Sequence, residues 1–202
     1  MLDSTAIVSV REQIARQLRA DIINGVLTEK TKLKEQELAA RFNVSRGPVR
    51  DVLLQLTKEG LLISKNNCGV IVNSAPKAEL QPLMVNLRVK IESHAIKITI
   101  NELTEEDFAQ LDKILATMTK AFEEENYSLV TESDMAFHRY IVNKAGGDDL
   151  VNLWQPVIYR MRMNYKRIST PKECFEEHNQ LLTYLKNKEL KLALASLKEN
   201  VK

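Results

Sequence analysis

The chain has 202 residues, with 29 Lys and Arg against 27 Asp and Glu and a formal net charge of +2. This length fits one large domain or two small ones, and 44% hydrophobic residues are typical of a globular protein. Two isolated cysteines exclude a disulfide framework, and no apolar run approaches the roughly 20 residues needed to span a membrane. Because the N-terminus also lacks a signal-peptide core, the sequence predicts a cytoplasmic protein.

Residues 33–60 predict two short helices joined by a tight turn. The first covers residues 35–42 and ends at Asn43, a residue type that adopts the left-handed conformation readily. Ser45 is a good N-cap for the second helix. Arg46 and Arg50 are one turn apart on the outer face of that helix, near an N-terminus that favours phosphate. This pattern is typical of a helix-turn-helix, in which the second helix meets the base edges of DNA.

The flanking segments complete a winged helix. Upstream, an apolar residue at every fourth position from Val10 to Ile22 predicts another helix, and Gly25 is placed to end it. Downstream, the apolar runs 61–63 and 70–72 are separated by turn residues and predict a β-hairpin, the wing. The alternative interpretation is an ordinary small domain whose paired arginines form a solvated face.

A specific set of residues in this region resembles a known family. The set comprises Ile22, Gly25, Leu27, Leu33, Glu35, Leu38, the run VSRGPVR at 44–50, Glu59-Gly60-Leu61 and Gly69. With these residues, segment 9–73 resembles the winged-helix domain of the GntR family of bacterial transcription regulators. The resemblance implies that Arg46 and Arg50 contact the operator, that Ser45 contributes at the start of the recognition helix, and that Gly69 lets the wing approach the minor groove. The chain departs from the family pattern at Glu29-Lys30 and at Asn67-Cys68 in the wing tip.

The charge distribution agrees with this assignment. Residues 1–73 hold 11 Lys and Arg against 8 Asp and Glu, whereas residues 74–202 hold 18 against 19. The basic excess therefore lies in the predicted DNA-binding module. Its small size favours a localised, sequence-reading contact over a broad polycationic surface.

The domain boundary is expected at residues 73–76, where small and polar residues end in a proline. We expect a DNA-binding domain at 1–73, a linker at 74–79 and a second domain at 80–202. No strand pattern follows the boundary, and periodic apolar residues predict six helices, the second of them capped by Thr104. The predicted fold class is mainly α, a winged helix-turn-helix with a small β-hairpin followed by an all-α helical bundle. The six helices are marked by residues 80–98, 108–118, 135–142, 150–161, 175–185 and 190–201.

Metal-binding chemistry in the second domain is concentrated in a few residues. Asp134 and His138 are four apart, so on a helix both side chains can reach one ion. His178 shares the inward face of another helix with apolar residues, and Asn200 lies near the inward face of the last. A metal ion between the helices would satisfy all four, and the alternative is a set of hydrogen-bonded core side chains.

A second resemblance rests on Leu87-Arg88, Glu92, the run DMAFHRYI at 134–141, Glu177-His178 and the terminal helix. With them, residues 80–202 resemble the FCD domain, the helical effector domain of the FadR subfamily. The resemblance implies zinc, nickel or a similar divalent ion held by one Asp and three His, beside a cavity for a small carboxylate effector. Asp134, His138 and His178 match three of these positions, and Asn200 stands where the fourth ligand is usually His. Because an amide oxygen is a weaker and harder ligand than imidazole, affinity for zinc or nickel should fall.

Arg88 is the candidate anchor for the effector carboxylate, since guanidinium offers a planar bidentate match. The alternative for Arg88 is an i,i+4 ion pair with Glu92. His94 shares the face of Leu87, and we expect it to be a packed or interface residue.

The predicted function is that of a homodimeric, effector-responsive transcription regulator, not an enzyme. By family frequency it is a repressor, and two winged helices read successive major grooves of a pseudo-palindromic operator in double-stranded DNA. One alternative is a metal-dependent hydrolase that uses Asp134, His138 and His178, with Glu177 as the neighbouring acid or base. Another is a DNA-binding dimer without regulation, whose helical domain is purely structural. No membrane partner is expected.

Overall fold

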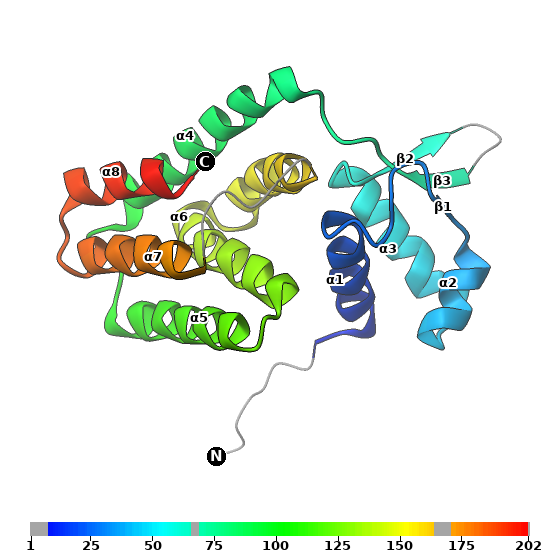
Figure 1. The fold of residues 1–202 in the computed structure, drawn as a ribbon, viewed down its shortest axis with the longest axis horizontal. Helices are drawn as coiled ribbons and strands as arrows, with labels where there is room; N and C mark the ends of the chain where they lie inside the picture. Colours follow the sequence, from blue (N-terminus) through cyan, green and yellow to red (C-terminus); the bar gives the residue numbers. More distant parts are fainter. Residues whose placement is uncertain (1–7, 66–68, 164–170, 202) are drawn as a thin grey trace, which may run out of the picture. The chain divides into compact units, whose positions relative to one another are not determined.

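The structure is a computed structural model that describes residues 8–65, 69–163 and 171–201 (Figure 1). The chain divides into two compact units between Pro76 and Lys77. In the described part of the chain, no helix combines the length and the apolar composition that a membrane span requires. The predicted fold class is confirmed, because a winged helix-turn-helix precedes an all-helical unit.

Three helices and a small sheet make up the N-terminal unit. Helices α1 (Val10–Ile23), α2 (Glu35–Phe42) and α3 (Arg46–Lys58) agree with the predicted helices. Asn43 ends α2 in the left-handed conformation, with φ 52° and ψ 49°, as predicted. Gly25 follows α1 with φ +74°, also as predicted. The turn between α2 and α3 therefore forms from the local preferences of the residues in it.

The sheet of this unit has three antiparallel strands in the order β1-β3-β2. Strands β2 (Leu62–Lys65) and β3 (Gly69–Val72) form the predicted hairpin, and the wing-tip residues Asn67 and Cys68 lie outside the described residues. Strand β1 (Lys32–Leu33) was not predicted, because two residues are too few for an alternating pattern. It pairs with β3 through Lys32–Ile71 and Leu33–Val70, and so fixes the wing at the start of α2.

A buried ion pair joins the first and third helices of this unit. The guanidinium of Arg19 on α1 donates to both carboxylate oxygens of Glu59, at 2.7 Å each. Glu59 is the C-cap residue of α3, and both side chains are 9% exposed. Gln55 adds a 3.0 Å hydrogen bond to the same carboxylate. These contacts set the position of α3, whose inner face packs through Val49, Val52, Leu53 and Leu56.

The C-terminal unit contains only helices within its described residues. A 3-10 turn, η1 (Ala78–Leu80), leads into α4 (Gln81–Thr99), and α5 (Glu105–Glu123) follows. Next come α6 (Tyr127–Arg162), α7 (Pro171–Lys186) and α8 (Leu190–Asn200). Helix α7 packs against both α5 and α8, and α8 also packs against α4. A continuous apolar core, with Phe137, Trp154 and Leu181 among its buried members, fills the space between the helices.

The third and fourth predicted helices are the two halves of α6, which is broken at a glycine pair. Gly146 has φ −150°, and Gly147 has φ 55° with ψ −148°, a conformation that side chains strongly disfavour. A Cβ atom at Gly146 would lie 2.7 Å from the Cβ of Leu150. The chain therefore turns here without a loop, and Asp134 and His138 lie on the first half.

Helix α4 has the predicted extent, but its apolar marker residues face outward. Leu80, Leu83, Leu87 and Ile98 are between 39% and 54% exposed. His94 is exposed as well, so it is not packed within the single chain, and its interface role stays a prediction. The buried face of α4 is instead partly charged, since it contains Arg88 and Glu92. Periodicity located the helix but could not show which of its two faces meets the core.

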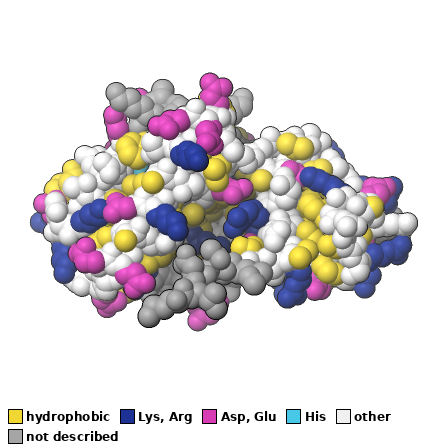
Figure 2. Space-filling model, turned by 90° about the horizontal axis from the view of Figure 1, so that it is seen from below, with side chains coloured by type: hydrophobic (Ala, Val, Ile, Leu, Met, Phe, Trp, Pro, Cys, Tyr) yellow, Lys and Arg dark blue, Asp and Glu magenta, His cyan; other side chains and the backbone are white. Residues whose placement is uncertain are grey.

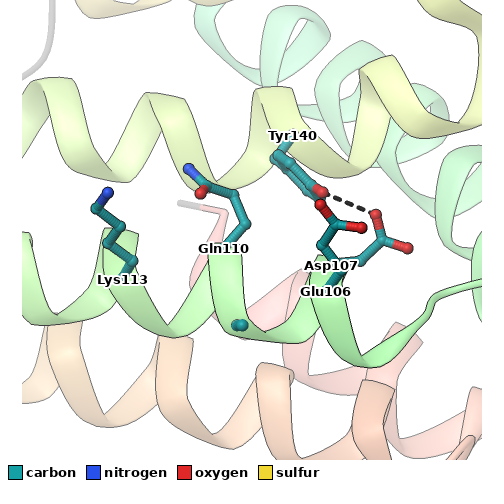
Figure 3. Close-up of a pocket in the computed structure, with 6 residues that line it drawn as sticks. Glu106, Asp107, Gln110, Lys113 and Tyr140 are labelled. Carbon is teal, nitrogen blue, oxygen red and sulfur yellow. Dashed lines mark hydrogen bonds between the residues drawn. The ribbon is translucent and has the colours of Figure 1, made fainter. Parts of the chain in front are cut away.

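Helix α5 begins with the predicted cap at Thr104. Side chains from α6 also bind the capping residue Asp107. The Thr104 hydroxyl accepts from the Asp107 amide, and the Asp107 carboxylate accepts from the Thr104 amide, a complete capping box. Asp107 also accepts a hydrogen bond from the Tyr140 hydroxyl at 2.7 Å (Figure 3) and one from Lys144 at 2.9 Å. A surface depression of about 590 Å³ lies beside it, lined partly by Gln110 and Lys113. None of the predicted site residues line this depression.

Candidate functional site

The turn of the helix-turn-helix presents Ser45 and Arg46 to solvent. Ser45 occupies the N-cap position of α3 with extended backbone geometry, φ −71° and ψ 166°. Its side chain makes no capping hydrogen bond, so the N-terminal amides of α3 are not blocked by a hydroxyl. Arg46, the first residue of the helix, is exposed. A helix N-terminus of this kind attracts phosphate oxygens.

Arg50 lies one turn further along α3 and is held by an acidic residue. Its Nε and Nη2 atoms each donate to one carboxylate oxygen of Glu35, both at 2.9 Å. The Arg50 side chain is nevertheless 63% exposed, and that of Glu35 is 33% exposed. The hydrogen bond from Arg50 lowers the pKa of Glu35, and the same bond raises the pKa of Arg50. Sequence analysis did not identify this role of Glu35, because the pairing joins two different helices.

Gly69 opens strand β3 with φ +77°, a conformation that favours glycine. It pairs with Lys65 across the hairpin and is exposed. Over the face of the protein in Figure 2, Lys and Arg side chains alternate with Asp and Glu rather than forming one broad basic area. This mixture agrees with the small net charge of +2 of the whole chain.

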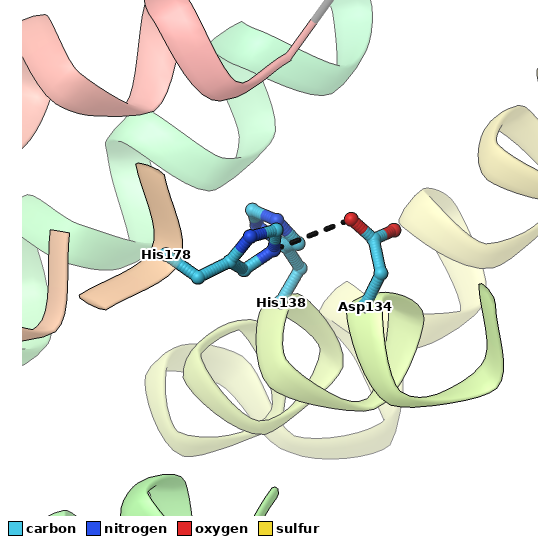
Figure 4. A group of neighbouring side chains, drawn as sticks. All are labelled: Asp134, His138 and His178. Carbon is cyan, nitrogen blue, oxygen red and sulfur yellow. Dashed lines mark ion pairs between the residues drawn. The ribbon is translucent and has the colours of Figure 1, made fainter. Parts of the chain in front are cut away.

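Three of the four predicted metal ligands lie together between α6 and α7. Asp134 and His138 project from α6 toward His178 on α7, and their ligand atoms lie within 4.8 Å of one another (Figure 4). Both histidines are 1% exposed and Asp134 is 8% exposed. The ring of Phe137 packs edge-on against both imidazoles, with centroids 5.6 and 5.2 Å away. Tertiary packing therefore brings His178 to residues 40 or more positions earlier in the chain.

The hydrogen bonds of His178 leave its second nitrogen facing the cluster. Nδ1 lies 2.7 Å from the carbonyl oxygen of Cys174 and donates to it, so Nε2 is the nitrogen that faces the cluster. That Nε2 faces Asp134 Oδ1 at 3.2 Å. Two acceptors at this distance require a cation, either a proton or a metal ion. Burial lowers the pKa of His178, but the hydrogen bonds to Asp134 and Cys174 outweigh burial and raise this pKa to about 10.

His138 is oriented in the same way by a carboxylate. Its Nδ1 lies 2.8 Å from Glu92 Oε2, and burial lowers the pKa of the imidazole, which favours the neutral ring. Nδ1 then donates to Glu92, and Nε2 is an acceptor without a hydrogen-bond partner among the described residues. A carboxylate on the outer nitrogen is the usual way in which proteins orient a metal-binding histidine.

Glu92 connects this histidine to Arg88. Glu92 Oε1 accepts hydrogen bonds from Arg88 Nε at 2.8 Å and from Trp154 Nε1 at 2.7 Å. Burial raises the pKa of Glu92, but Arg88 and His138 together lower it to about 2. The i,i+4 ion pair considered as an alternative role for Arg88 is therefore present. It forms one continuous path from the candidate effector anchor to the candidate metal ligand, and the indole of Trp154 supports that path.

Asn200, the fourth predicted ligand, reaches the cluster from the end of α8. Its amide nitrogen lies 3.0 Å from Nδ1 of His178, the nitrogen turned away from Asp134, and because Nδ1 donates to Cys174 these two atoms are both donors. Its Oδ1 is buried without a hydrogen-bond partner among the described residues. Asn200 therefore contacts the outer side of His178, while its oxygen is still unpaired.

The residues present fit a divalent cation. Two imidazole nitrogens and a carboxylate oxygen converge, and each ring has a polar partner at its outer nitrogen. Among the described residues, the inward nitrogen of His138 and the oxygen of Asn200 are buried without hydrogen-bond partners. Buried polar atoms without partners are costly, and a metal ion would compensate for that cost. Two nitrogen and one or two oxygen donors suit borderline ions such as zinc, nickel or manganese.

Comparisons with known proteins agree with the two-unit fold, a winged helix-turn-helix followed by a helical unit. The family described as bacterial regulatory proteins, gntR family, matches residues 10–72, and the FCD domain matches residues 83–202. The chain is 28% identical to the HTH-type transcriptional repressor RspR of Escherichia coli over 89% of its own length and 80% of that protein. It is 27% identical to the gluconate operon transcriptional repressor of Bacillus subtilis over 93% and 80% of the two chains. The solved structure of E. coli McbR shares the fold, with a TM-score of 0.79 at 23% identity over 96% and 94% of the chains.

Proposed function

This chain belongs to the GntR family of bacterial regulatory proteins, with an FCD domain as its second unit, and from this membership we infer that it is a DNA-binding repressor of transcription controlled by a small effector. The observation that carries the DNA-binding part is the exposed recognition helix, with Arg46 and Arg50 one turn apart at its start. The observation that supports the sensing part is the buried cluster of Asp134, His138 and His178.

The hydrolase alternative is wrong. The matched families and the named relatives are regulators of transcription. Next to the cluster, the buried carboxylate of Glu92 accepts hydrogen bonds from Arg88 and Trp154 and pairs with His138, and its pKa of about 2 makes it a poor proton donor near neutral pH.

The proposed effector is a small carboxylate that contacts both Arg88 and a divalent metal ion. Asp134, His138 and His178 would hold the ion, with Asn200 beside them, and the ion would offer open coordination positions to carboxylate oxygens. The path from Arg88 through Glu92 to His138 supports this pairing, because both groups that attract an anion belong to one network. One relative is named for the gluconate operon, and gluconate is itself a small carboxylate.

The proposed assembly is a homodimer that reads a pseudo-palindromic operator. The exposed apolar residues Leu83, Leu87 and Ile98 support this assembly, because spacings of 4 and 11 residues place them on similar sides of α4, and the exposed Leu80 immediately precedes that helix. A second copy packed against this face would bury them. Sedimentation equilibrium tests this part, with Leu83→Glu and Leu87→Glu expected to give monomers.

DNA binding is tested by fluorescence anisotropy with the full chain at near-physiological salt. We expect a dissociation constant on the order of 10⁻⁸ M or tighter for DNA flanking its own gene, and about a thousandfold preference over a scrambled duplex. Arg46→Ala and Arg50→Ala should each abolish much of this preference. Arg16→Ala is the matched control, since Arg16 is an exposed arginine on α1 and the charge change is the same. Equal losses in all three variants would show a purely electrostatic effect.

Metal binding is tested by calorimetric titration of chelator-treated protein with zinc, nickel or manganese. The chain has three histidines, so His178→Ala and His138→Ala should lose the binding heat, while His94→Ala, at an exposed position, should keep it. Release of DNA by candidate carboxylates then tests regulation, and Arg88→Lys should lose that response while it still binds DNA. A His178→Ala variant that binds no metal but responds normally to the carboxylate would contradict the metal-dependent sensing proposed here.

A further inference from the structure

The two arginines of the recognition helix are in different states. The side chain of Arg46 is exposed and makes no hydrogen bond to another described residue, although its charge helps to lower the pKa of Glu35. Arg50 is fixed by two parallel hydrogen bonds of 2.9 Å to Glu35, although it is 63% exposed. A bidentate pair with good geometry at an exposed position restricts a side chain that is otherwise highly flexible. The fold therefore orders one of the two arginines before DNA is present.

The geometry of the pair leaves a defined part of Arg50 available. Glu35 occupies the Nε and Nη2 side of the guanidinium, and Nη1 has no hydrogen-bond partner among the described residues. The outer edge formed by Nη1 and Nη2 can still donate two parallel hydrogen bonds. In the major groove, O6 and N7 of guanine are the pair of acceptors that matches such an edge.

We propose that Glu35 is a positioning residue for sequence recognition, and that it holds Arg50 so that its outer edge reads a guanine in the operator. This inference rests on the proposed DNA-binding function. Because the arginine is already ordered, less side-chain freedom is lost when the base contact forms. The position of Glu35 also tethers the reading side chain to α2, so that two helices determine where the guanidinium lies.

A simple charge effect would act in the opposite direction. A carboxylate near the DNA backbone repels phosphate, so its removal should strengthen binding to every duplex equally. Positioning instead predicts that removal of Glu35 weakens the preference for one particular base pair. The two effects are separable because one changes affinity for all sequences and the other changes discrimination at a single position.

The test uses the full chain and a duplex selected by the wild-type protein from a randomised library. Anisotropy titrations compare that duplex with versions in which each G·C pair is replaced by A·T, for the wild type and for Glu35→Gln, Arg50→Ala and the double variant. Glu37→Gln is the matched control, because Glu37 is an exposed acidic residue in the same turn of α2 and its ion pair is with Lys34, not with an arginine of α3. Circular dichroism melting establishes that each variant folds.

We expect replacement of one G·C pair to weaken wild-type binding about 10-fold and to have no effect on Arg50→Ala. At that pair alone, Glu35→Gln should reduce the discrimination several-fold, Glu37→Gln should retain it, and Glu35→Gln should change nothing further in the Arg50→Ala background. Full discrimination in Glu35→Gln, or an equal gain of affinity for all duplexes in both Gln variants, would overturn the inference. A wild type that selects no sequence would contradict the proposed function itself, before any variant is compared.

Discussion

Each unit of the protein buries a cluster of charged or ionisable side chains, and the two clusters differ in how well they are satisfied. In the N-terminal unit, Arg19 and Glu59 form a closed pair in which both carboxylate oxygens accept 2.7 Å hydrogen bonds. In the C-terminal unit, His178 faces Asp134 at 3.2 Å, and His138 Nε2 and Asn200 Oδ1 are buried without hydrogen-bond partners among the described residues. The first arrangement is complete without a ligand, whereas the second has buried acceptors that a cation would satisfy.

This contrast separates a structural role from a binding role. A fully paired buried ion pair fixes the packing of α1 against α3, so the exposed arginines of α3 are presented in a defined position. A cluster with unpaired acceptors instead stores an unfavourable interaction that a bound ion can relieve. Burial of charged groups therefore indicates a ligand site only when some of their polar atoms have no hydrogen-bond partner.

Breaking the closed pair should have the largest effect. Glu59→Gln leaves the Arg19 guanidinium buried without its counter-charge, and we expect a loss of about 3–5 kcal/mol in the free energy of unfolding of the N-terminal unit. Urea unfolding followed by far-UV circular dichroism measures this loss. Fluorescence of Trp154, the only tryptophan, reports the other unit and should shift little. Glu12→Gln is the control, because Glu12 contacts Arg19 at 3.2 Å from a 41% exposed side chain and should cost less than about 1 kcal/mol.

Completing the open cluster should stabilise the other unit. Zinc at a hundred times its dissociation constant should raise the free energy of unfolding by about 2.7 kcal/mol, since binding to the folded state alone shifts the equilibrium. Trp154 fluorescence during urea unfolding is the measurement, because this indole contacts Glu92 beside the cluster. His178→Ala should show no stabilisation by zinc, and His94→Ala should behave as the wild type. Equal stabilisation of both variants would place the ion elsewhere.

In the same unit as the cluster of Asp134, His138 and His178, Asp107 is fully hydrogen-bonded to neighbouring side chains. Asp107→Asn should cost about 2 kcal/mol, because it weakens a helix cap and a charged hydrogen bond to Lys144. Burial raises the pKa of Asp107, but hydrogen bonds from Thr104, Tyr140 and Lys144 outweigh it and hold the pKa well below its usual range.

The contribution of Asp107 should therefore be complete above the unfolded pKa of about 3.9 and decline as pH falls toward the folded value. Urea unfolding of the wild type and Asp107→Asn between pH 7 and pH 2.5 measures the difference. Asp112→Asn, at an exposed position on the same helix, is the control. A stability difference that stays constant to pH 2.5 would contradict the ionised state assigned to Asp107.

Asn200→His should have the smallest effect. It tests whether residue 200 belongs to the proposed metal ligands. An imidazole at this position offers zinc a fourth strong ligand, and we expect about tenfold tighter binding, which is about 1.4 kcal/mol. Calorimetric titration with zinc measures the change, with Asn179→His, at an exposed position on α7, as the control. Unchanged affinity would place residue 200 outside the ligand set, in contact only with the outer nitrogen of His178.

The sequence by itself determined the features that depend on near neighbours in the chain. The turn at Asn43, the cap at Thr104 and the pairing of Asp134 with His138 on one helix face all follow from spacings of a few residues. The resemblance of two segments to known families predicted a transcription regulator. The family matches over residues 10–72 and 83–202 confirm that resemblance.

Only the tertiary structure decided which distant groups meet. Periodicity could not show that the outward face of α4 is apolar and its inward face carries Arg88 and Glu92, because a helix with apolar residues on two faces has no single amphipathic direction. Strand β1, the pair of Glu35 with Arg50, and the contact of Trp154 with Glu92 likewise join residues 15 to 62 positions apart. Such pairings depend on how helices and strands pack against one another. They cannot be predicted from the residues close to each partner in the sequence.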